Sequence, residues 1–164
     1  MMQFAAVHES GTGTNRPPGT SAIRPLPGAK IAQEYVNRRE GFGIKLADRE
    51  SVQIKLGEVA HNIQIGRLLT MHAAWKLDQG DRARKEVSMA KVQVANTLHQ
   101  AADVAIQLQG ARGYSKDTVV EWIYRAARAA RLVDGADEVH KMVLARFMRE
   151  EGRDFWSWSA GNRV

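Results

Sequence analysis

The sequence predicts an all-α protein, an antiparallel four-helix bundle with a flexible N-terminal leader. All four prolines lie before residue 29, so no proline interrupts a helix beyond that point. Apolar residues then recur at helical spacing over segments of about 25 to 30 residues, and no segment shows the strict alternation of a half-buried strand. Long helices joined by short turns pack antiparallel to one another.

A step in composition divides the chain. Residues 1–28 combine the prolines with glycine, serine and threonine, and we expect them to form a flexible leader. Residues 29–152 carry the helical periodicity and are predicted to form the bundle. Residues 153–164 include the aromatic run Phe155–Trp158, which we expect to be a tail that packs along the bundle or against a partner subunit.

Glycines mark the boundary between the first two helices. Residues Ala29–Arg39 have the pattern of the end of a helix, which Gly41 and Gly43 close. The second helix is expected to begin with Asp48 or Ser51 as its cap. Its inward residues are predicted to be Val52, Leu56, Val59, Ile63, Met71, Ala74 and Leu77.

The third helix is delimited by glycines at both ends. Gly80 and Asp81 are predicted to end the second helix and cap the third, which runs to about Gln109. A tight connection follows at Gly110–Gly113. The inward residues of this helix are predicted to be Val87, Val94, Leu98, Ala101, Val104, Ala105 and Leu108.

Two further helices complete the bundle. Thr118 and Glu121 have the spacing of a capping box, which predicts the start of the fourth helix. Asp134 and Gly135 end that helix, because glycine suits the left-handed position after a helix end. Asp137 is expected to cap the last helix. The inward residues of these two helices are predicted to be Val120, Ile123, Ala127, Ala130, Val139, Met142, Val143 and Phe147.

Charge and composition limit the function. The 24 lysines and arginines exceed the 18 acids, and a formal net charge of +6 attracts phosphate-bearing partners. Arg125, Arg128 and Arg131 form a row that we expect to be a solvated helix face, so we predict no nucleic-acid partner. The chain has no cysteine, no apolar run long enough to span a membrane and no histidines at metal-ligand spacing. We therefore expect no metal and no membrane span, and a cytoplasmic location, or the mitochondrial matrix in a eukaryote.

Three carboxylates stand close together at Asp134, Asp137 and Glu138 in an otherwise basic chain. Asp134 ends a helix, where the helix dipole disfavours a negative charge. A carboxylate in such surroundings suits a general base that removes a proton from a weakly acidic C–H bond. The alternative is that Asp137 and Glu138 only serve a helix N-terminus, where acidic side chains are favourable.

Two glycine-containing turns suit an anion. Arg39 stands beside a turn with Phe42, so that its guanidinium could hold a phosphate while the ring covers a flat group. The alternative is an ordinary helix end with a core phenylalanine. The turn at Gly110–Gly113 would let backbone amides approach an anion, or it only connects two helices.

Several short segments between Lys30 and Glu150 follow one order with consistent gaps. Arg39 with Phe42 and Gly43 forms an Arg-x-x-Phe-Gly turn, and Gln53 follows it. The other segments are the Ser-Met-Ala-Lys stretch within Glu86–Lys91, the glycine turn within Ala105–Tyr114, the Tyr-Arg pair with a later arginine in Tyr124–Arg128, and Asp134–Arg146. Together these segments resemble the C-terminal domain of the acyl-CoA dehydrogenases.

This resemblance implies a flavoenzyme that oxidises an acyl-CoA thioester between its α and β carbons, with FAD as cofactor. It assigns Asp134 as the catalytic base that takes the α-proton, and it places Val133 and Gly135 beside the acyl chain. It also implies an acyl-CoA substrate and either a homo-oligomer, a dimer or a tetramer, or a complementary dehydrogenase chain. The residues that the resemblance assigns to FAD are Arg39, Phe42, Gln53, Gln107 and Gly110.

The sequence departs from the family pattern at Asp134, at Ala111 and at its N-terminus. Most relatives have glutamate at the base position, so the shorter Asp134 must reach the same carbon. Ala111 replaces the second glycine of the turn. The N-terminal and middle domains of the family have no counterpart in the chain, and we expect it to be incomplete and inactive alone. The alternative is a non-enzymatic helical module that kept the bundle for subunit association.

Overall fold

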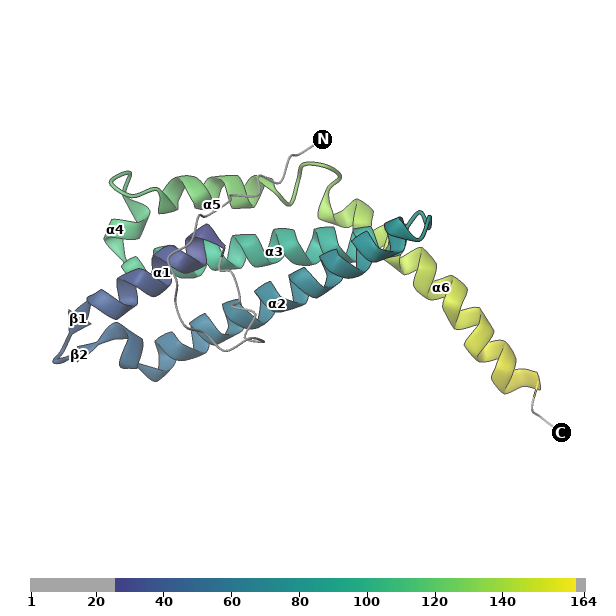
Figure 1. Cartoon of the computed structure of the whole chain (residues 1–164), viewed down its shortest axis with the longest axis horizontal. Coiled ribbons are helices and arrows are strands. Elements are labelled where there is room, and N and C mark those ends of the chain that lie inside the picture. Colours follow the sequence, from purple (N-terminus) through teal and green to yellow (C-terminus); the bar gives the residue numbers. More distant parts are fainter. Residues whose placement is uncertain (1–25, 162–164) are drawn as a thin grey trace.

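The computed structural model describes residues 26–161, and the side chains of residues 26–152. Most of the described chain is helical, which confirms the all-α prediction (Figure 1). The helices are α1 (Pro27–Arg38), α2 (Glu50–Asp78), α3 (Arg84–Gln109), α4 (Ala111–Tyr114), α5 (Val120–Ala129) and α6 (Asp137–Gly161).

Helices α1 and α6 extend beyond residues 29–152 at the two ends of the predicted bundle. The first 25 residues of the predicted leader lie outside the described residues. Pro27 and Gly28, predicted as leader, belong to α1, because proline is tolerated in the first turn of a helix. At the other end α6 continues to Gly161, so the backbone of the predicted tail is helical as far as that residue. The aromatic side chains of this tail lie outside the described side chains.

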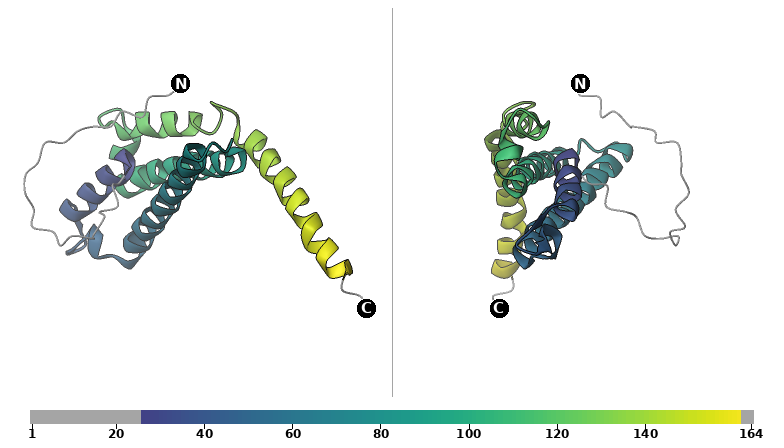
Figure 2. Two further views of the ribbon diagram at one scale, coloured as in Figure 1. Left: turned by 45° about the vertical axis from the view of Figure 1, so that its right-hand side comes forward. Right: turned by 90° about the vertical axis from the view of Figure 1, so that its left-hand side faces the viewer.

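Helix α3 is the centre of the bundle, and α1, α2, α5 and α6 all pack against it. Helices α2 and α3 lie side by side as a long antiparallel pair, with α1 and α5 along the same central helix (Figure 1). Helix α6 begins at the end of the bundle where α2 meets α3, and then projects away from the other helices (Figure 2). The bundle proper is therefore formed by α1, α2, α3 and α5.

Small residues make up most of the core. Ala32, Ala102, Ala105 and Ala127 have no exposed surface, and the largest fully buried apolar side chains are valines such as Val120. Such small side chains let helix axes approach closely, and the many contacts at these short separations compensate for the small apolar area of each residue. The close approach helps to explain why α3 contacts five other helices, α1, α2, α4, α5 and α6.

Some residues predicted to face inward are exposed in this chain. Helical spacing shows that one face is apolar, but it does not show which neighbour covers that face. The face of α2 that carries Met71, Ala74 and Leu77 is left exposed, and α6 leaves the bundle after its first turns. The exposed residues are Met71, Ala74, Leu77, Val87, Val139 and Met142.

The predicted helix caps are largely wrong. Helix α2 begins after Arg49, and neither Asp48 nor Ser51 caps it. The capping box at the start of α5 does not form, because the Thr118 hydroxyl donates to the Arg112 carbonyl instead. Asp81 does form a hydrogen bond just before α3, because its carboxylate accepts from the backbone N–H of Ala83 at 3.0 Å.

A short hairpin separates α1 from α2, where the sequence predicted no strand. Strands β1 (Glu40–Gly41) and β2 (Ile44–Lys45) pair antiparallel, and a 3-10 turn, Leu46–Asp48, follows them. Each strand has two residues, too few for the alternation that marks a strand in a sequence. Phe42 and Gly43 form the tip, with φ angles of +54° and +82°.

Candidate functional site

The turn that carries Asp134 joins α5 to α6 over residues 130–136. Asp134 and Gly135 both have positive φ angles, +54° and +91°. The left-handed conformation is natural for glycine, whereas in an aspartate it costs about 1 kcal/mol. The Asp134 side chain is exposed, and so is its neighbour Val133. The predicted base is thus displayed on a turn whose conformation must be held by other contacts.

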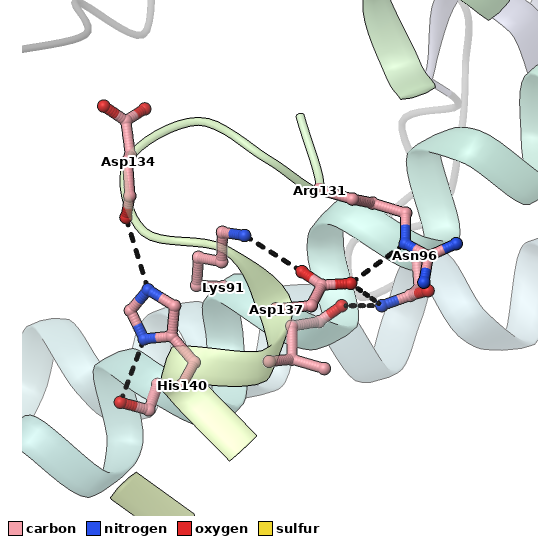
Figure 3. A network of polar contacts seen from close by, with 8 residues as sticks. Lys91, Asn96, Arg131, Asp134, Asp137 and His140 are labelled. Atoms are coloured by element: carbon pink, nitrogen blue, oxygen red, sulfur yellow. Dashed lines mark hydrogen bonds and ion pairs between the residues drawn. The ribbon is translucent and has the colours of Figure 1, made fainter. Parts of the chain in front are cut away.

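Asp137 holds the base of this turn through a buried network. Its side chain is only 1% exposed. Oδ1 accepts a hydrogen bond of 2.9 Å from Lys91 Nζ, while Oδ2 accepts bonds of 2.9 Å from Arg131 Nε and 3.0 Å from Asn96 Nδ2 (Figure 3). Arg131, predicted to lie on a solvated face, therefore belongs to an internal ion-pair cluster. The predicted cap Asp137 is the first residue of α6, and its carboxylate connects this helix to α3.

Opposing effects act on the pKa of Asp137. Burial raises the pKa, because the charged form loses its contact with water. Hydrogen bonds from Lys91, Arg131 and Asn96 lower it, and their sum prevails, so that the pKa lies below its ordinary value. Asp137 is therefore a permanent anion near neutral pH and a structural anchor. Asp137 therefore does more than stabilise the N-terminus of α6, which was the alternative considered from the sequence.

His140 supplies a second anchor for the turn. Its Nε2 lies 3.3 Å from the Asp134 carbonyl oxygen, and its Nδ1 lies 3.1 Å from Ser88 Oγ on α3 (Figure 3). A carbonyl can only accept, so in the neutral ring Nε2 carries the proton and Nδ1 accepts from the serine hydroxyl. A Cβ atom at Gly135 would lie 2.9 Å from His140 Nε2, which excludes a larger residue there without displacing the ring.

The predicted FAD residues near the hairpin are exposed. Phe42 is 101% exposed at the tip, which contradicts the alternative of a core phenylalanine. Arg49 contacts the hairpin in two ways. Its Nη2 donates to the Gly41 carbonyl at 2.6 Å, and its guanidinium lies 5.7 Å from the centre of the Phe42 ring. The side chain of Arg39 is exposed, and Gln53 Nε2 donates to the Ala47 carbonyl at 3.0 Å.

The other two predicted FAD residues lie where α3 meets α4. Gln107 is exposed on the last turn of α3, and Gly110 follows with a φ of +62°. A Cβ at Gly110 would meet no atom within 4 Å, so the backbone is open to a ligand from that side. Ala111 is exposed as the first residue of α4, and the tight contact of this turn is at Gly113, whose Cβ would lie 2.8 Å from the Ile106 carbonyl.

These residues form two separate groups on the bundle. The hairpin and α4 lie at one end, and the Asp134 turn lies at the other (Figures 1 and 2). Ser88, which contacts the Asp134 turn through His140, and Gly110 are near opposite ends of α3, about 30 Å apart along the helix. Within one chain the structure therefore brings Val133, Asp134 and Gly135 together but does not bring them to the predicted FAD residues.

Sequence reasoning did not identify several residues that build this geometry. Lys91 and Asn96 hold Asp137, His140 holds Asp134, and Arg49 holds the hairpin. One signal was present in the sequence, because Lys91 stands at helical spacing between Val87 and Val94, which were both predicted to face inward. A buried cation of this kind needs an anion, but its partner is 46 residues away in the sequence.

The described residues offer no other strong site. A groove of about 550 Å³ between α2 and α3 is open and polar. No group of histidine, aspartate and glutamate side chains among residues 26–152 is arranged to hold a metal. None of the described helices is long and apolar enough to cross a membrane. The residues that line the groove are Asn62, Gln93, Asn96, Thr97, His99, Gln100 and Asp103.

Comparisons with known proteins agree on the family. The family profile described as "Acyl-CoA dehydrogenase, C-terminal domain" matches residues 28–149. (R)-Benzylsuccinyl-CoA dehydrogenase from Thauera aromatica is 36% identical over 123 residues, which cover 74% of this chain and 30% of that protein. The structure of a putative acyl-CoA dehydrogenase from Mycobacterium abscessus matches with a TM-score of 0.72 and 35% identity, over 76% of this chain and 31% of that one.

The fold is also shared with a more distant flavoprotein. The FAD complex of PigA has a TM-score of 0.71 and 23% identity, covering 74% of this chain and 32% of that chain, and this likeness shows the fold alone. The present chain spans about a third of the length of each of these proteins. The chain belongs to the acyl-CoA dehydrogenase family, and residues 28–149 are its C-terminal domain.

Proposed function

We propose that this domain takes part in the FAD-dependent oxidation of an acyl-CoA thioester, with Asp134 as the base that removes the α-proton. The observation that carries the proposal is the state of the Asp134 carboxylate. It is exposed on an anchored turn, and it makes no hydrogen bond or ion pair with any described residue. A carboxylate free of partners can accept a proton from a substrate placed against it.

The residues assigned to FAD suit a cofactor held along one edge of the domain. Phe42 offers an exposed ring, Arg39 offers a cation for a phosphate, and Gly110 offers a backbone that a ligand can approach. The bound flavin would accept the hydride from the β carbon. In this proposal the chain contacts FAD at one end of the bundle and presents the base at the other end.

The distance between these two ends supports the proposal of an oligomer. Groups about 30 Å apart along α3 cannot meet at the same reacting atoms. We therefore propose that the FAD residues of one subunit serve the active site to which another subunit, or a complementary chain, contributes the base. Family membership supports an acyl-CoA as the substrate class of this proposal.

Replacement of the base tests the catalytic proposal in the flavin-loaded assembly. Asp134→Asn keeps the shape of the side chain but cannot accept the proton, and kcat should fall at least about 100-fold. Glu138→Gln is the matched control, because Glu138 is an exposed carboxylate four residues away, and its kcat should stay unchanged. An Asp134→Asn enzyme as fast as the wild type would refute the assignment.

Subunit association without catalysis is the second candidate, and the outer face of α2 favours it. Leu68, Met71 and Trp75 are 57%, 69% and 55% exposed and follow one another at helical spacing. An apolar stripe of this kind on a surface is typical of a protein–protein contact. Trp75→Ser should then lower the assembly size measured by analytical ultracentrifugation, whereas Trp122→Ser on α5 should not. Assemblies that never retain FAD would favour this candidate over the enzyme.

A further inference from the structure

We infer that the buried network around Asp137 is a positioning device for Asp134, and that Asp137 and Lys91 are positioning residues of the reaction. The inference rests on the proposed role of Asp134 as the base. Neither residue touches the Asp134 carboxylate, which points away from the network (Figure 3). Both act on it through the backbone of the turn.

The turn is closed on itself at its base. The backbone N–H of Asp137 donates to the Arg131 carbonyl at 3.1 Å, and Arg131 Nε donates to Asp137 Oδ2 at 2.9 Å. Residues 132–136 lie between these two points and include the base. A loop whose two ends are bonded to each other twice has few conformations to sample, so the position of Asp134 is largely set by the position of its ends.

Helix α3 holds this closed loop in place. Lys91 Nζ and Asn96 Nδ2 both bond to the Asp137 carboxylate, at 2.9 Å and 3.0 Å, from the central helix of the bundle. The Asp137 side chain is almost fully buried, and Lys91 is only 16% exposed, so water screens their attraction weakly. Hydrogen bonds to charged groups are also directional, which fixes the loop in angle as well as in distance.

The backbone of Asp134 shows that this restraint is needed. A non-glycine residue keeps a left-handed conformation, here with φ of +54°, only where surrounding contacts impose it. The Asp134 side chain has no partner among the described residues, and its carbonyl bonds to His140 alone. The restraint must therefore come from the two ends of the loop and from His140, and Asp137 is the most buried of these groups.

An aspartate base depends on accurate placement more than a glutamate does. Its carboxylate is one methylene closer to the backbone, so it has one fewer rotatable bond to correct an error in the main chain. A displacement of about 1 Å at a reacting group costs about 100-fold in rate. A loop that carries an aspartate base should accordingly be anchored by groups that allow little movement, as the buried charges of this network do.

The first experiment measures the loop directly by hydrogen–deuterium exchange in the assembled protein. Lys91→Met and Asp137→Asn should each speed the exchange of the amides of Val133 and residue 137 about tenfold or more, because these amides donate to the carbonyls of Ala129 and Arg131, both at 3.1 Å. Exchange in the middle of α2 should stay unchanged. Lys85→Met is the matched control, because Lys85 also joins α3 to α6, through an exposed ion pair with Glu151. This control should leave the loop unchanged, and Lys91→Met covers the case in which Asp137→Asn fails to fold.

The second experiment is a double-mutant cycle on turnover. In the wild-type background Lys91→Met should lower kcat about 100-fold and change KM by less than about twofold. In the Asp134→Asn background the same substitution should cost nothing further, because Lys91 acts only through the base. A purely structural role would lower the active fraction equally in both backgrounds, and that result would overturn the inference.

The failure of the inference and the failure of the proposed function have different signatures. An unchanged kcat in Asp134→Asn refutes the base assignment itself. Unchanged loop exchange in Lys91→Met and Asp137→Asn, together with a slow Asp134→Asn enzyme, refutes the positioning role alone.

Discussion

Arg131 and Asp137 bond to each other twice, through their main chains at 3.1 Å and through their side chains at 2.9 Å. The first residue lies just beyond α5 and the second begins α6, so the pair closes the turn between the two helices. Asp134 is carried on the closed turn with its carboxylate directed away from the pair (Figure 3). The stability of this pair and the display of the candidate base are thus physically linked.

The stability of the chain should depend on the ionisation of Asp137. Its pKa is lowered from the ordinary value of 3.8, because hydrogen bonds from Lys91, Arg131 and Asn96 outweigh the effect of burial. A carboxyl with a lowered folded-state pKa contributes stability above its unfolded value, and the contribution is lost as the pH falls through the folded-state pKa. The free energy of unfolding should therefore fall as the pH drops below 3.8.

Urea unfolding of wild type and Asp137→Asn between pH 7 and pH 2 checks this expectation. Asp81 also has a lowered pKa, caused first by the hydrogen bond from the Ala83 backbone, and it contributes to acid sensitivity in both proteins. The difference between the two curves isolates Asp137. Parallel curves down to the lowest pH would contradict the expectation.

Arg128 on α5 and Arg131 just beyond its end should differ in their effect on stability. Arg131→Met removes a hydrogen bond to a nearly buried carboxylate and should cost about 1 to 2 kcal/mol, reduced from a fully buried bond because the arginine is partly exposed. Arg128→Met on the exposed face should change the free energy of unfolding by less than about 0.5 kcal/mol. Equal effects in urea unfolding would show that Arg131 is not part of an internal anchor.

Gly135 should be required in the turn. A Cβ there would lie 2.9 Å from His140 Nε2, and φ is +91°, so Gly135→Ala should cost about 1 to 3 kcal/mol. Gly57→Ala is the control, because Gly57 lies inside α2 with nothing within 4 Å of its Cβ position, and it should gain about 0.5 to 1 kcal/mol. Thermal unfolding of both variants measures the contrast, and a stabilised Gly135→Ala would contradict the packing described for His140.

Phe42 should affect cofactor retention without affecting stability. Its side chain is fully exposed, so Phe42→Ala leaves the core intact and should not change Tm. If the ring covers part of FAD, the variant should release flavin faster in gel filtration of the assembly. Trp122→Ala, which removes another exposed aromatic on α5, should retain flavin normally. Equal flavin retention by both variants would show that Phe42 does not contact FAD.

Local patterns in the sequence predicted helices and turns better than they predicted which side chains contact one another. Asp134 and Gly135 were predicted to end the fourth helix in a left-handed conformation; the conformation is present, but α5 already ends at Ala129. Thr118 and Glu121 indicated a capping box, but the threonine hydroxyl bonds to the Arg112 carbonyl, which tertiary packing brings within reach. Met71 was expected inside because helical spacing identifies an apolar face, although nothing in the described chain covers that face.

By itself, the sequence determined the helical class, the turn at Asp134 and the segments that identify the family, because all of these depend on residues close together in the chain. Only the tertiary structure revealed Asp137 as the anchor of that turn, since Lys91 and Asn96 are 46 and 41 residues away from it in the sequence. The tertiary structure also placed the predicted FAD residues at the far end of α3 from the turn that carries Asp134. The physical reason is that a local pattern sets backbone conformation, whereas burial and charge pairing depend on which helices pack together.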